Sequence, residues 1–272
     1  MKWSIIISII HCSWASAPNQ SERQQTIFGQ PVVPGVEYPL PRVDRLVASG
    51  RYDDAIHHVL YSEDSVRPIS DAGVDCLLLH LKTKIDALRC EYREWTIRIE
   101  SSHPRHPELP LHEMNRDMTR GFIQRNSRDA FAVVRRFIVD GGRGVDEMMM
   151  LYRKAGDYAR YIAEVDLDPK CRTLDVAMEY YSEALAMAPD SVQALEIKNS
   201  IGLVVRQRDG YRAGIAYLER VVAEEQASLV VNMATELTSP EAARQRLSVV
   251  DLMRNNIEAW KPASEMEEWV VV

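Results

Sequence analysis

The sequence predicts an all-α protein, and three observations support that prediction. Aromatic residues make up only 7% of the 272 residues, whereas Ala, Leu, Glu, Arg and 11 Met recur throughout, a composition that favours helices over strands. Apolar residues between positions 43 and 262 recur at helical spacing, and no alternating run of Val, Ile and Thr is long enough to predict a sheet. Prolines and glycines divide the same region into pieces of about 15 to 30 residues. Helices joined by short loops pack antiparallel, so we expect an antiparallel helical array.

Residues 1–41 are predicted to form a leader without a packed core of its own. Lys2, an apolar run over 3–10 and the small residues of 15–17 are typical of a secretory signal, and the run is too short to span a bilayer. Pro18 directly follows the cleavage position and disfavours cutting there, so a signal and an uncleaved segment both stay open. The Gln, Pro, Gly and Ser of the remaining leader leave it too few apolar residues for a core.

The cysteines favour a reducing compartment. After cleavage of a signal the chain would keep Cys76, Cys90 and Cys171, an odd and widely spaced set that resembles no disulfide framework. We therefore expect free thiols and a cytoplasmic protein. The secretory pathway is the alternative if residues 1–17 act as a signal.

The helical domain is predicted to span residues 42–261. Its internal boundaries are helix breakers, which lie at Pro68, 104–110, 141–144, 168–169, Pro189 and 209–210. The clearest helix has an apolar stripe over 174–188 and ends where proline prevents continuation. Ser239 is a candidate N-cap, followed by Pro240 at the first position of the last helix. Residues 262–272 are predicted to form an acidic tail.

Charge and motifs favour a binding protein over an enzyme. The formal net charge of −7 argues against partners such as nucleic acid or an anionic membrane, because both attract excess positive charge. The glycines of 141–144 have no Lys-Ser/Thr pair after them, which favours a turn over a phosphate loop. His103 and His106 lie among prolines typical of an exposed loop, and His112 lacks the second histidine that would put two zinc ligands on one helical face. We expect no catalysis, no cofactor and no bound metal.

Basic residues at helical spacing form the main candidate site. Lys82, Arg89 and Arg93 lie seven and four positions apart on one helical face, and Arg153 and Arg160 repeat the seven-residue step on another. Brought together, the two faces would form a concave positive patch that grips a phosphate dianion within an otherwise acidic protein. The spacing leaves a second interpretation open, in which both faces are solvated and form scattered salt bridges.

Three segments resemble signature segments of the 14-3-3 family: Arg-Tyr-Asp-Asp at 51–54, Gly-Asp-Tyr-Ala-Arg-Tyr-Ile-Ala-Glu at 156–164 and Leu-Met-Arg-Asn-Asn-Ile-Glu-Ala-Trp at 252–260. The similarity runs from Arg51 to Glu164 without a net gap. It implies a nine-helix cup that holds an extended segment of a client protein phosphorylated on serine or threonine. Within that resemblance, the phosphate would be bound by Lys82, Arg89, Arg160 and Tyr161. Arg93 and Arg153 would widen the positive field around them.

The resemblance implies further contacts with the bound peptide. Asn199 and Asn256 fall where the family's asparagines hold the main chain of the peptide, a task that suits a carboxamide because it both donates and accepts. Leu252 and Trp260 fall on the walls of the groove. Their spacing fits core packing of the last helix equally well.

The resemblance also implies a dimer. Arg51, Tyr52 and Asp54 would pack against a second protomer, either in a homodimer or in a heterodimer with a related protein. Glu91 falls in that interface, at the position of the family's regulatory serine, and an unpaired buried carboxylate there would cost several kcal/mol. A second departure is Arg206, which stands where the family has a groove glutamate.

A tetratricopeptide-like scaffold is the alternative. Residues 50–58, 180–188 and 211–223 resemble helices of such repeats, whose concave face would bind unphosphorylated peptides. The regular period of about 34 residues that defines these repeats does not extend across the chain. Dependence of binding on phosphate separates the two functions.

Overall fold

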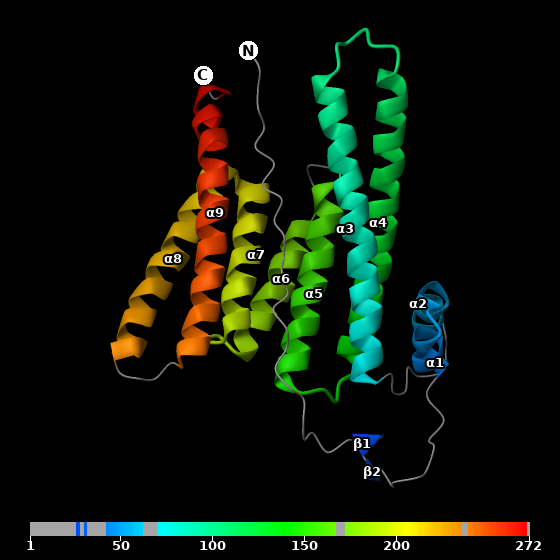
Figure 1. Cartoon of the computed structure of the whole chain (residues 1–272), viewed down its shortest axis with the longest axis vertical. Coiled ribbons are helices and arrows are strands. Elements are labelled where there is room, and N and C mark those ends of the chain that lie inside the picture. The colour runs from blue at the N-terminus through cyan, green and yellow to red at the C-terminus, as the bar shows by residue number, and fades with distance from the viewer. Residues whose placement is uncertain are drawn as a thin grey trace. The chain divides into compact units, whose positions relative to one another are not determined.

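The computed structural model describes residues 26–27, 30–31, 42–61, 70–166, 172–234 and 239–270. The chain divides into two compact units, Met1–Leu40 and Pro41–Val272. In the first unit, strands β1 (Thr26–Ile27) and β2 (Gln30–Pro31) form an antiparallel pair. The described part of the second unit contains nine helices (Figure 1).

Short connections join most of the helices of the second unit. Their bounds are α1 (Arg42–Ala48), α2 (Tyr52–Tyr61), α3 (Asp71–Ser101), α4 (Leu109–Asp140), α5 (Val145–Glu164), α6 (Thr173–Met187), α7 (Val192–Asp209), α8 (Tyr211–Ala234) and α9 (Pro240–Val270). The predicted all-α fold is confirmed. The cup-shaped arrangement of these helices stays a prediction.

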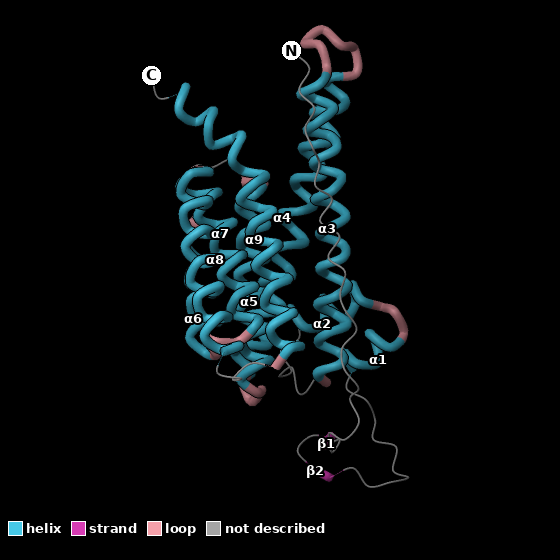
Figure 2. The backbone as a smooth tube through the Cα atoms, turned by 60° about the vertical axis from the view of Figure 1, so that its left-hand side comes forward, coloured by secondary structure: helices cyan, strands magenta, loops and turns pink. Residues whose placement is uncertain are grey.

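Most helices pack against their neighbours in the chain. Thus α3 packs on α4, α4 on α5, α5 on α6, α7 on α8 and α8 on α9. Four contacts skip a helix, because α1 also packs on α3, α2 on α4, and α7 on both α5 and α9. The helices α3 and α4 form a long hairpin that extends beyond the ends of their neighbours (Figures 1 and 2). One apolar core lies among α1 to α5, a second among α5 to α7 and a third among α7 to α9.

Local sequence signals fix several helix ends. The hydroxyls of Ser70 and Ser191 each accept a hydrogen bond from the backbone N–H three residues on, at 3.1 and 3.0 Å, and so cap α3 and α7. Ser239 caps α9 in the same way at 3.2 Å, and Pro240 begins the helix as predicted. Gly210, which has a φ of 93°, ends α7 because glycine adopts this left-handed backbone without strain.

The last helix continues past the predicted domain end. Residues from Pro262 onward form the end of α9 as far as Val270, instead of a separate tail. A proline inside a helix lacks the N–H that would bond to the carbonyl four residues earlier, at Glu258, and its ring crowds that carbonyl. The helical spacing before Pro262 predicts the helix, whereas its continuation through the proline could not be predicted from that rule.

The helices α5 and α6 approach closely at Gly156. A Cβ atom at this position would lie 2.6 Å from the ring of Tyr181, which is fully buried in α6. Glycine is therefore required for this approach. The Tyr181 hydroxyl donates a 2.7 Å hydrogen bond to Asp157, which ties the packing of α6 to the charged residues of α5.

Candidate functional site

Charged residues of α3 and α5 meet in one cluster, which we call the α3–α5 ion cluster. It consists of Lys82, Asp86, Arg89, Asp157, Arg160, Tyr161 and Glu164. Steps of three, four and seven residues place these side chains on one face of each helix. The structure thus brings together the four residues predicted to bind phosphate.

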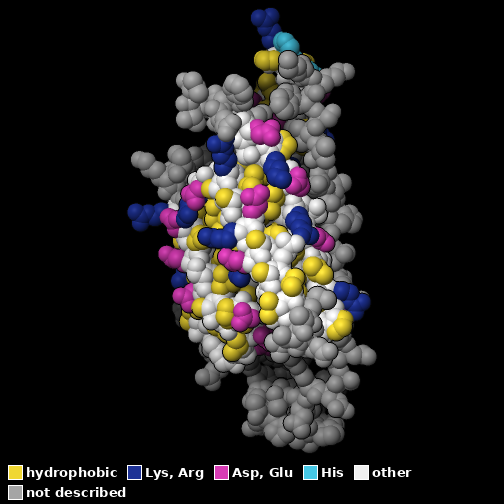
Figure 3. All heavy atoms as spheres, turned by 90° about the vertical axis from the view of Figure 1, so that its left-hand side faces the viewer, with side chains coloured by type: hydrophobic (Ala, Val, Ile, Leu, Met, Phe, Trp, Pro, Cys, Tyr) yellow, Lys and Arg dark blue, Asp and Glu magenta, His cyan; other side chains and the backbone are white. Residues whose placement is uncertain are grey.

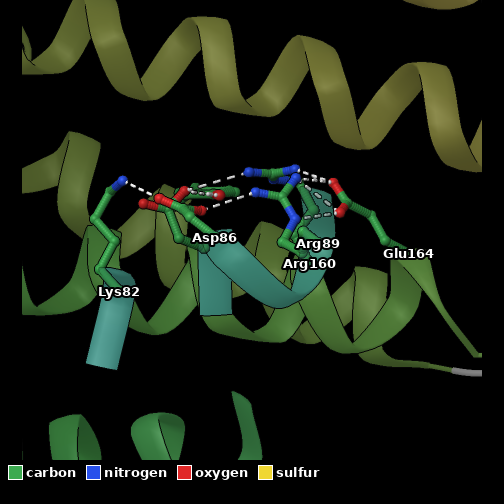
Figure 4. Close-up of polar contacts among 7 residues, drawn as sticks. Lys82, Asp86, Arg89, Arg160 and Glu164 are labelled. Atoms are coloured by element: carbon green, nitrogen blue, oxygen red, sulfur yellow. Dashed lines mark hydrogen bonds and ion pairs between the residues drawn. The ribbon is translucent and has the colours of Figure 1, made fainter. Parts of the chain in front are cut away.

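Two arginines of this cluster share one carboxylate. Arg89 Nε donates to Glu164 Oε2 at 2.8 Å and Arg89 Nη2 to Glu164 Oε1 at 2.9 Å, a two-pronged pair between α3 and α5. Arg160 Nη1 donates to the same Oε1 atom at 2.6 Å. Figure 4 shows both guanidinium groups beside Glu164, with Lys82 and Asp86 on their other side. The two guanidinium groups therefore converge on a single oxyanion.

The remaining cations of the cluster also have carboxylate partners. Lys82 forms an ion pair with Asp86, and Arg89 Nη1 donates to Asp86 Oδ1 at 3.2 Å. Arg160 Nη2 lies 3.9 Å from an oxygen of Asp157. The three cations thus face the carboxylates of Asp86, Asp157 and Glu164, and their formal charges cancel. The predicted patch of positive charge is a balanced cluster in this structure.

Tyr161 contacts both guanidinium groups. The Cζ atom of Arg89 is 4.0 Å from the centre of the Tyr161 ring, and that of Arg160 is 4.7 Å away, so both cations contact the electron-rich ring. Burial raises the pKa of Tyr161 to about 12, which keeps its hydroxyl protonated at neutral pH. Burial opposes the charged form of Arg160, but the Glu164 carboxylate, together with Tyr181, Tyr161 and Asp157, outweighs it and holds the pKa of Arg160 well above its ordinary value.

The two supporting arginines lie outside this cluster. Arg153 forms an ion pair with Glu196 of α7, and Arg93 is exposed and forms no ion pair with any described residue. Lys154, which is not one of the predicted site residues, is half-buried and forms no ion pair with any described residue. Burial lowers the pKa of Lys154, and the repulsion of Arg153 and Lys82 adds to that, while Asp157 acts in the opposite direction.

The predicted peptide-holding asparagines meet at the seam between α7 and α9. Asn256 Nδ2 donates to Asn199 Oδ1 at 3.0 Å, and both side chains are buried. Trp260 is 5% exposed and packs in the apolar core among α7 to α9, whereas Leu252 is half-buried. Trp260 therefore packs as a core residue of the last helix, which is the alternative that its spacing left open. A peptide reaching the asparagines would have to exchange partners with this hydrogen bond.

Arg206 continues the same seam. Its Cζ atom lies 5.2 Å from the ring centre of Trp260 in α9 and 5.5 Å from that of Tyr211 at the start of α8. The guanidinium group thus covers the buried tryptophan from the side of α7.

The residues predicted for a dimer interface have partners within the protomer. Arg51 Nε donates to Asp54 Oδ2 at 2.7 Å, and the Tyr52 ring stacks on His80 with 4.3 Å between ring centres. The carboxylate of Glu91 accepts hydrogen bonds from Trp95 Nε1 at 3.3 Å and from Thr119 Oγ1 at 3.4 Å. The dimer itself stays a prediction.

The two cysteines of α3 are exposed, whereas a free cysteine is usually among the most buried residues of a folded protein. Cys76 and Cys90 carry free thiols, as expected, and both are exposed. Cys171 lies outside the described residues, as do Pro68, the 168–169 breaker and almost all of the leader.

Helical spacing predicted the cations of the α3–α5 ion cluster, whereas its carboxylates were not predicted. The signal was present, because Asp86 lies four residues after Lys82 and Asp157 three residues before Arg160. Glu164 lies four residues after Arg160. Such spacings place opposite charges together on a helix surface.

Comparisons with protein-family models and with curated proteins bear on the predicted family. No protein-family model matches this chain, and no curated protein matches it. The resemblance to the 14-3-3 family therefore stays a prediction that rests on the quoted segments.

Three further findings concern metal ligation, membrane crossing and surface charge. In the described part of the chain, no group of three or more His, Cys, Asp and Glu side chains is arranged to hold a metal ion. Among the described helices, none is both long and apolar enough to cross a membrane. On the side where α8 lies in Figure 1, the described basic and acidic side chains are interspersed, without a large area of one sign (Figure 3).

Proposed function

We propose that this protein is an adaptor that binds client proteins through a phosphorylated serine or threonine. The observation that carries the proposal is the convergence of Arg89 and Arg160, from two helices, on the single carboxylate of Glu164. A pair of guanidinium groups already oriented around one oxyanion suits a phosphate, which is larger and carries more negative charge than a carboxylate.

Phosphate binding on this cluster is an exchange of anions. The phosphate takes over guanidinium donors that Glu164 now occupies, while the Tyr161 hydroxyl supplies a further donor because it stays protonated. Lys82 is about a third exposed and adds a cation at the open side of the cluster. The released Glu164 carboxylate gains solvation, since its side chain is already 24% exposed. The proposal assigns binding to these residues and no chemical reaction.

The quoted segments support membership of the 14-3-3 family as part of this proposal. Membership carries with it a homodimer or heterodimer built on Arg51, Tyr52, Asp54 and Glu91, contacts from Asn199 and Asn256 to the client main chain, and a cytoplasmic location. Phosphorylated clients are then the partners, with no nucleic acid or membrane among them.

A tetratricopeptide-like scaffold for unphosphorylated peptides is the second candidate. The observation that favours it is the charge balance of the α3–α5 ion cluster, whose three carboxylates already neutralise its three cations. In that function the cluster only holds α3 and α5 together.

A paired peptide library separates the two functions. Binding of a phosphoserine library and of its unphosphorylated twin is measured by fluorescence anisotropy on the wild type and on Arg160→Lys. We expect the wild type to select phosphorylated sequences, and Arg160→Lys to lose about tenfold or more in affinity for them, since hydrogen bonds to charged groups contribute about 1.5 to 3 kcal/mol. Equal selection from both libraries by the wild type would support the scaffold instead.

Arg244→Lys is the matched control. Arg244 is 74% exposed near the start of α9 and pairs with Glu241, so this change alters an arginine without touching the cluster. It should leave the phosphorylated-to-plain ratio unchanged. Because that ratio is taken within each variant, a small loss of folded protein does not affect it.

A further inference from the structure

The last turn of α7 holds an arginine whose charge no carboxylate of the described residues balances. Arg206 is half-buried, yet no acidic side chain of the described residues lies within ion-pair distance of it. Its neighbour Arg208 differs, because it pairs with Asp209 at 2.8 Å and lies 3.6 Å from Asp175. In a protein with a net charge of −7, an unbalanced and partly desolvated cation is a local site for an anion.

Packing holds the Arg206 guanidinium in place. The group lies over the rings of Trp260 and Tyr211. The base of the same side chain is held by α8, which approaches at Gly214, where a Cβ atom would lie 2.6 Å from the Cβ of Arg206. Stacking on aromatic faces leaves the N–H groups at the edge of the guanidinium plane available as donors. A guanidinium group restrained in this way can donate two parallel hydrogen bonds to a carboxylate.

The position of Arg206 relates it to the proposed peptide path. Arg206 follows Asn199 by seven residues on the same face of α7, which corresponds to about 10 Å along the helix axis. Both residues contact α9, at Asn256 and Trp260, so the seam runs from the asparagine pair to the arginine. An extended peptide advances about 3.3 Å per residue, so this length corresponds to about three residues of bound chain.

We propose that Arg206 is a specificity-determining residue that binds an acidic side chain of the client, about three residues along the bound chain from the asparagine pair. The inference rests on the proposed function and deepens it, because it names the chemistry that this protein reads beside the phosphate. Clients with Asp or Glu at that one position are preferred, and clients with Lys or Arg there are disfavoured.

A scan of phosphopeptides tests the inference. Starting from one bound phosphopeptide, a single Glu, Lys or Ala is placed at each flanking position in turn, and affinities are measured for the wild type, Arg206→Gln and Arg206→Glu. At one position the wild type should bind the Glu peptide about 3- to 10-fold more tightly than the Ala peptide, as expected for a partly exposed charge-assisted contact. Arg206→Gln should abolish that gain, and Arg206→Glu should prefer Lys at the same position.

Arg208→Gln is the control, since it removes a neighbouring arginine that is already paired. It should keep the Glu preference of the wild type. Peptides are compared on one variant at a time, so a loss of stability by the variant does not mimic the result. Phosphate-dependent binding without a Glu preference at any position, or a preference that survives in Arg206→Gln, would overturn this inference alone. Equal affinity for phosphorylated and plain peptides would overturn the proposed function, and the inference with it.

Discussion

Arg89 and Glu164 lie 75 residues apart in the chain, and their side chains form a two-pronged ion pair with N–O distances of 2.8 and 2.9 Å. This pair joins the middle of α3 to the end of α5, and Arg160 of α5 donates to the same carboxylate. One acidic side chain therefore both fixes the helices and occupies the site that we assign to phosphate.

Replacing Glu164 with Gln should reduce the stability of the fold. Two largely buried guanidinium groups would lose their shared carboxylate, and breaking a buried ion pair costs about 3 to 5 kcal/mol, less where one partner is partly exposed as Glu164 is. We expect a loss of about 1.5 to 3 kcal/mol in urea unfolding. The exposed Glu183→Gln in α6 is the control and should change stability by less than about 0.5 kcal/mol.

Added phosphate should restore part of the stability lost in Glu164→Gln. The vacated guanidinium groups of Arg89 and Arg160 bind the ion in the native state only, which raises the unfolding free energy by mass action. Thermal midpoints are compared in phosphate and in chloride buffers of equal ionic strength. A larger shift in Glu164→Gln than in the wild type is expected, and equal shifts would show that the cluster does not accept phosphate.

Gly156→Ala should destabilise the contact between α5 and α6. The added methyl group would lie 2.6 Å from the rigid ring of Tyr181, and overpacking of this kind costs about 1 to 3 kcal/mol. Gly121→Ala in α4 is the matched control, because a methyl group there meets nothing within 4 Å. The control should gain about 0.5 to 1 kcal/mol from helix propensity. A stabilised Gly156→Ala would contradict the close approach of the two helices.

Asn256→Ala should be costly although it removes only one side chain. It leaves the buried amide of Asn199 without its partner, and an unsatisfied buried polar group costs about 1 to 3 kcal/mol. The adjacent Asn255→Ala is exposed and should have an effect below about 0.5 kcal/mol. Equal effects of the two changes in chemical unfolding would mean that the hydrogen bond between the asparagines does not form.

Stability should fall above pH 10. Burial raises the pKa of Tyr158, Tyr161 and Tyr181 above the ordinary value of 10, to about 12 for Tyr161. Unfolded tyrosines lose their protons first, so the unfolded state binds fewer protons and stability decreases as pH rises from 10 through 12. Burial lowers the pKa of Lys154, which has the opposite effect on stability. Between that lowered pKa and the ordinary value of 10.5, the unfolded state binds more protons and stability rises with pH.

Urea unfolding at pH 9 and pH 11 measures this loss. Tyr161→Phe removes one of the titrating groups and should lose less stability between the two pH values than the wild type. A wild type whose stability is unchanged at pH 11 would contradict the burial of these hydroxyls.

Much of the fold follows from local signals. The stripe over 174–188 predicts α6, and the Ser239-Pro240 pair predicts the start of α9, because caps, prolines and apolar periodicity act within a few residues. The continuation of α9 through Pro262 could not be predicted, since a proline that ends most helices is tolerated here.

The cations of the α3–α5 ion cluster could be predicted, whereas its charge balance could not. Helical spacing alone brought Arg89 and Arg160 into one hypothesis, because two basic stripes can meet across neighbouring helices. The arrangement of α3 relative to α5 decides that Glu164 binds both arginines. The packing of α7 on α9 decides that Asn199 and Asn256 bind each other. Such long-range pairings are not encoded in the spacing of residues within one helix.

The central claim is that phosphate on the client decides binding. Calorimetric titration of the wild type with one library-selected phosphoserine peptide, and with the same peptide lacking phosphate, tests it most directly. We predict that the phosphorylated peptide binds at least about tenfold more tightly, as the hydrogen bonds from Arg89 and Arg160 to a dianion require. Equal dissociation constants for the two peptides would contradict the account and leave the α3–α5 ion cluster a purely structural link.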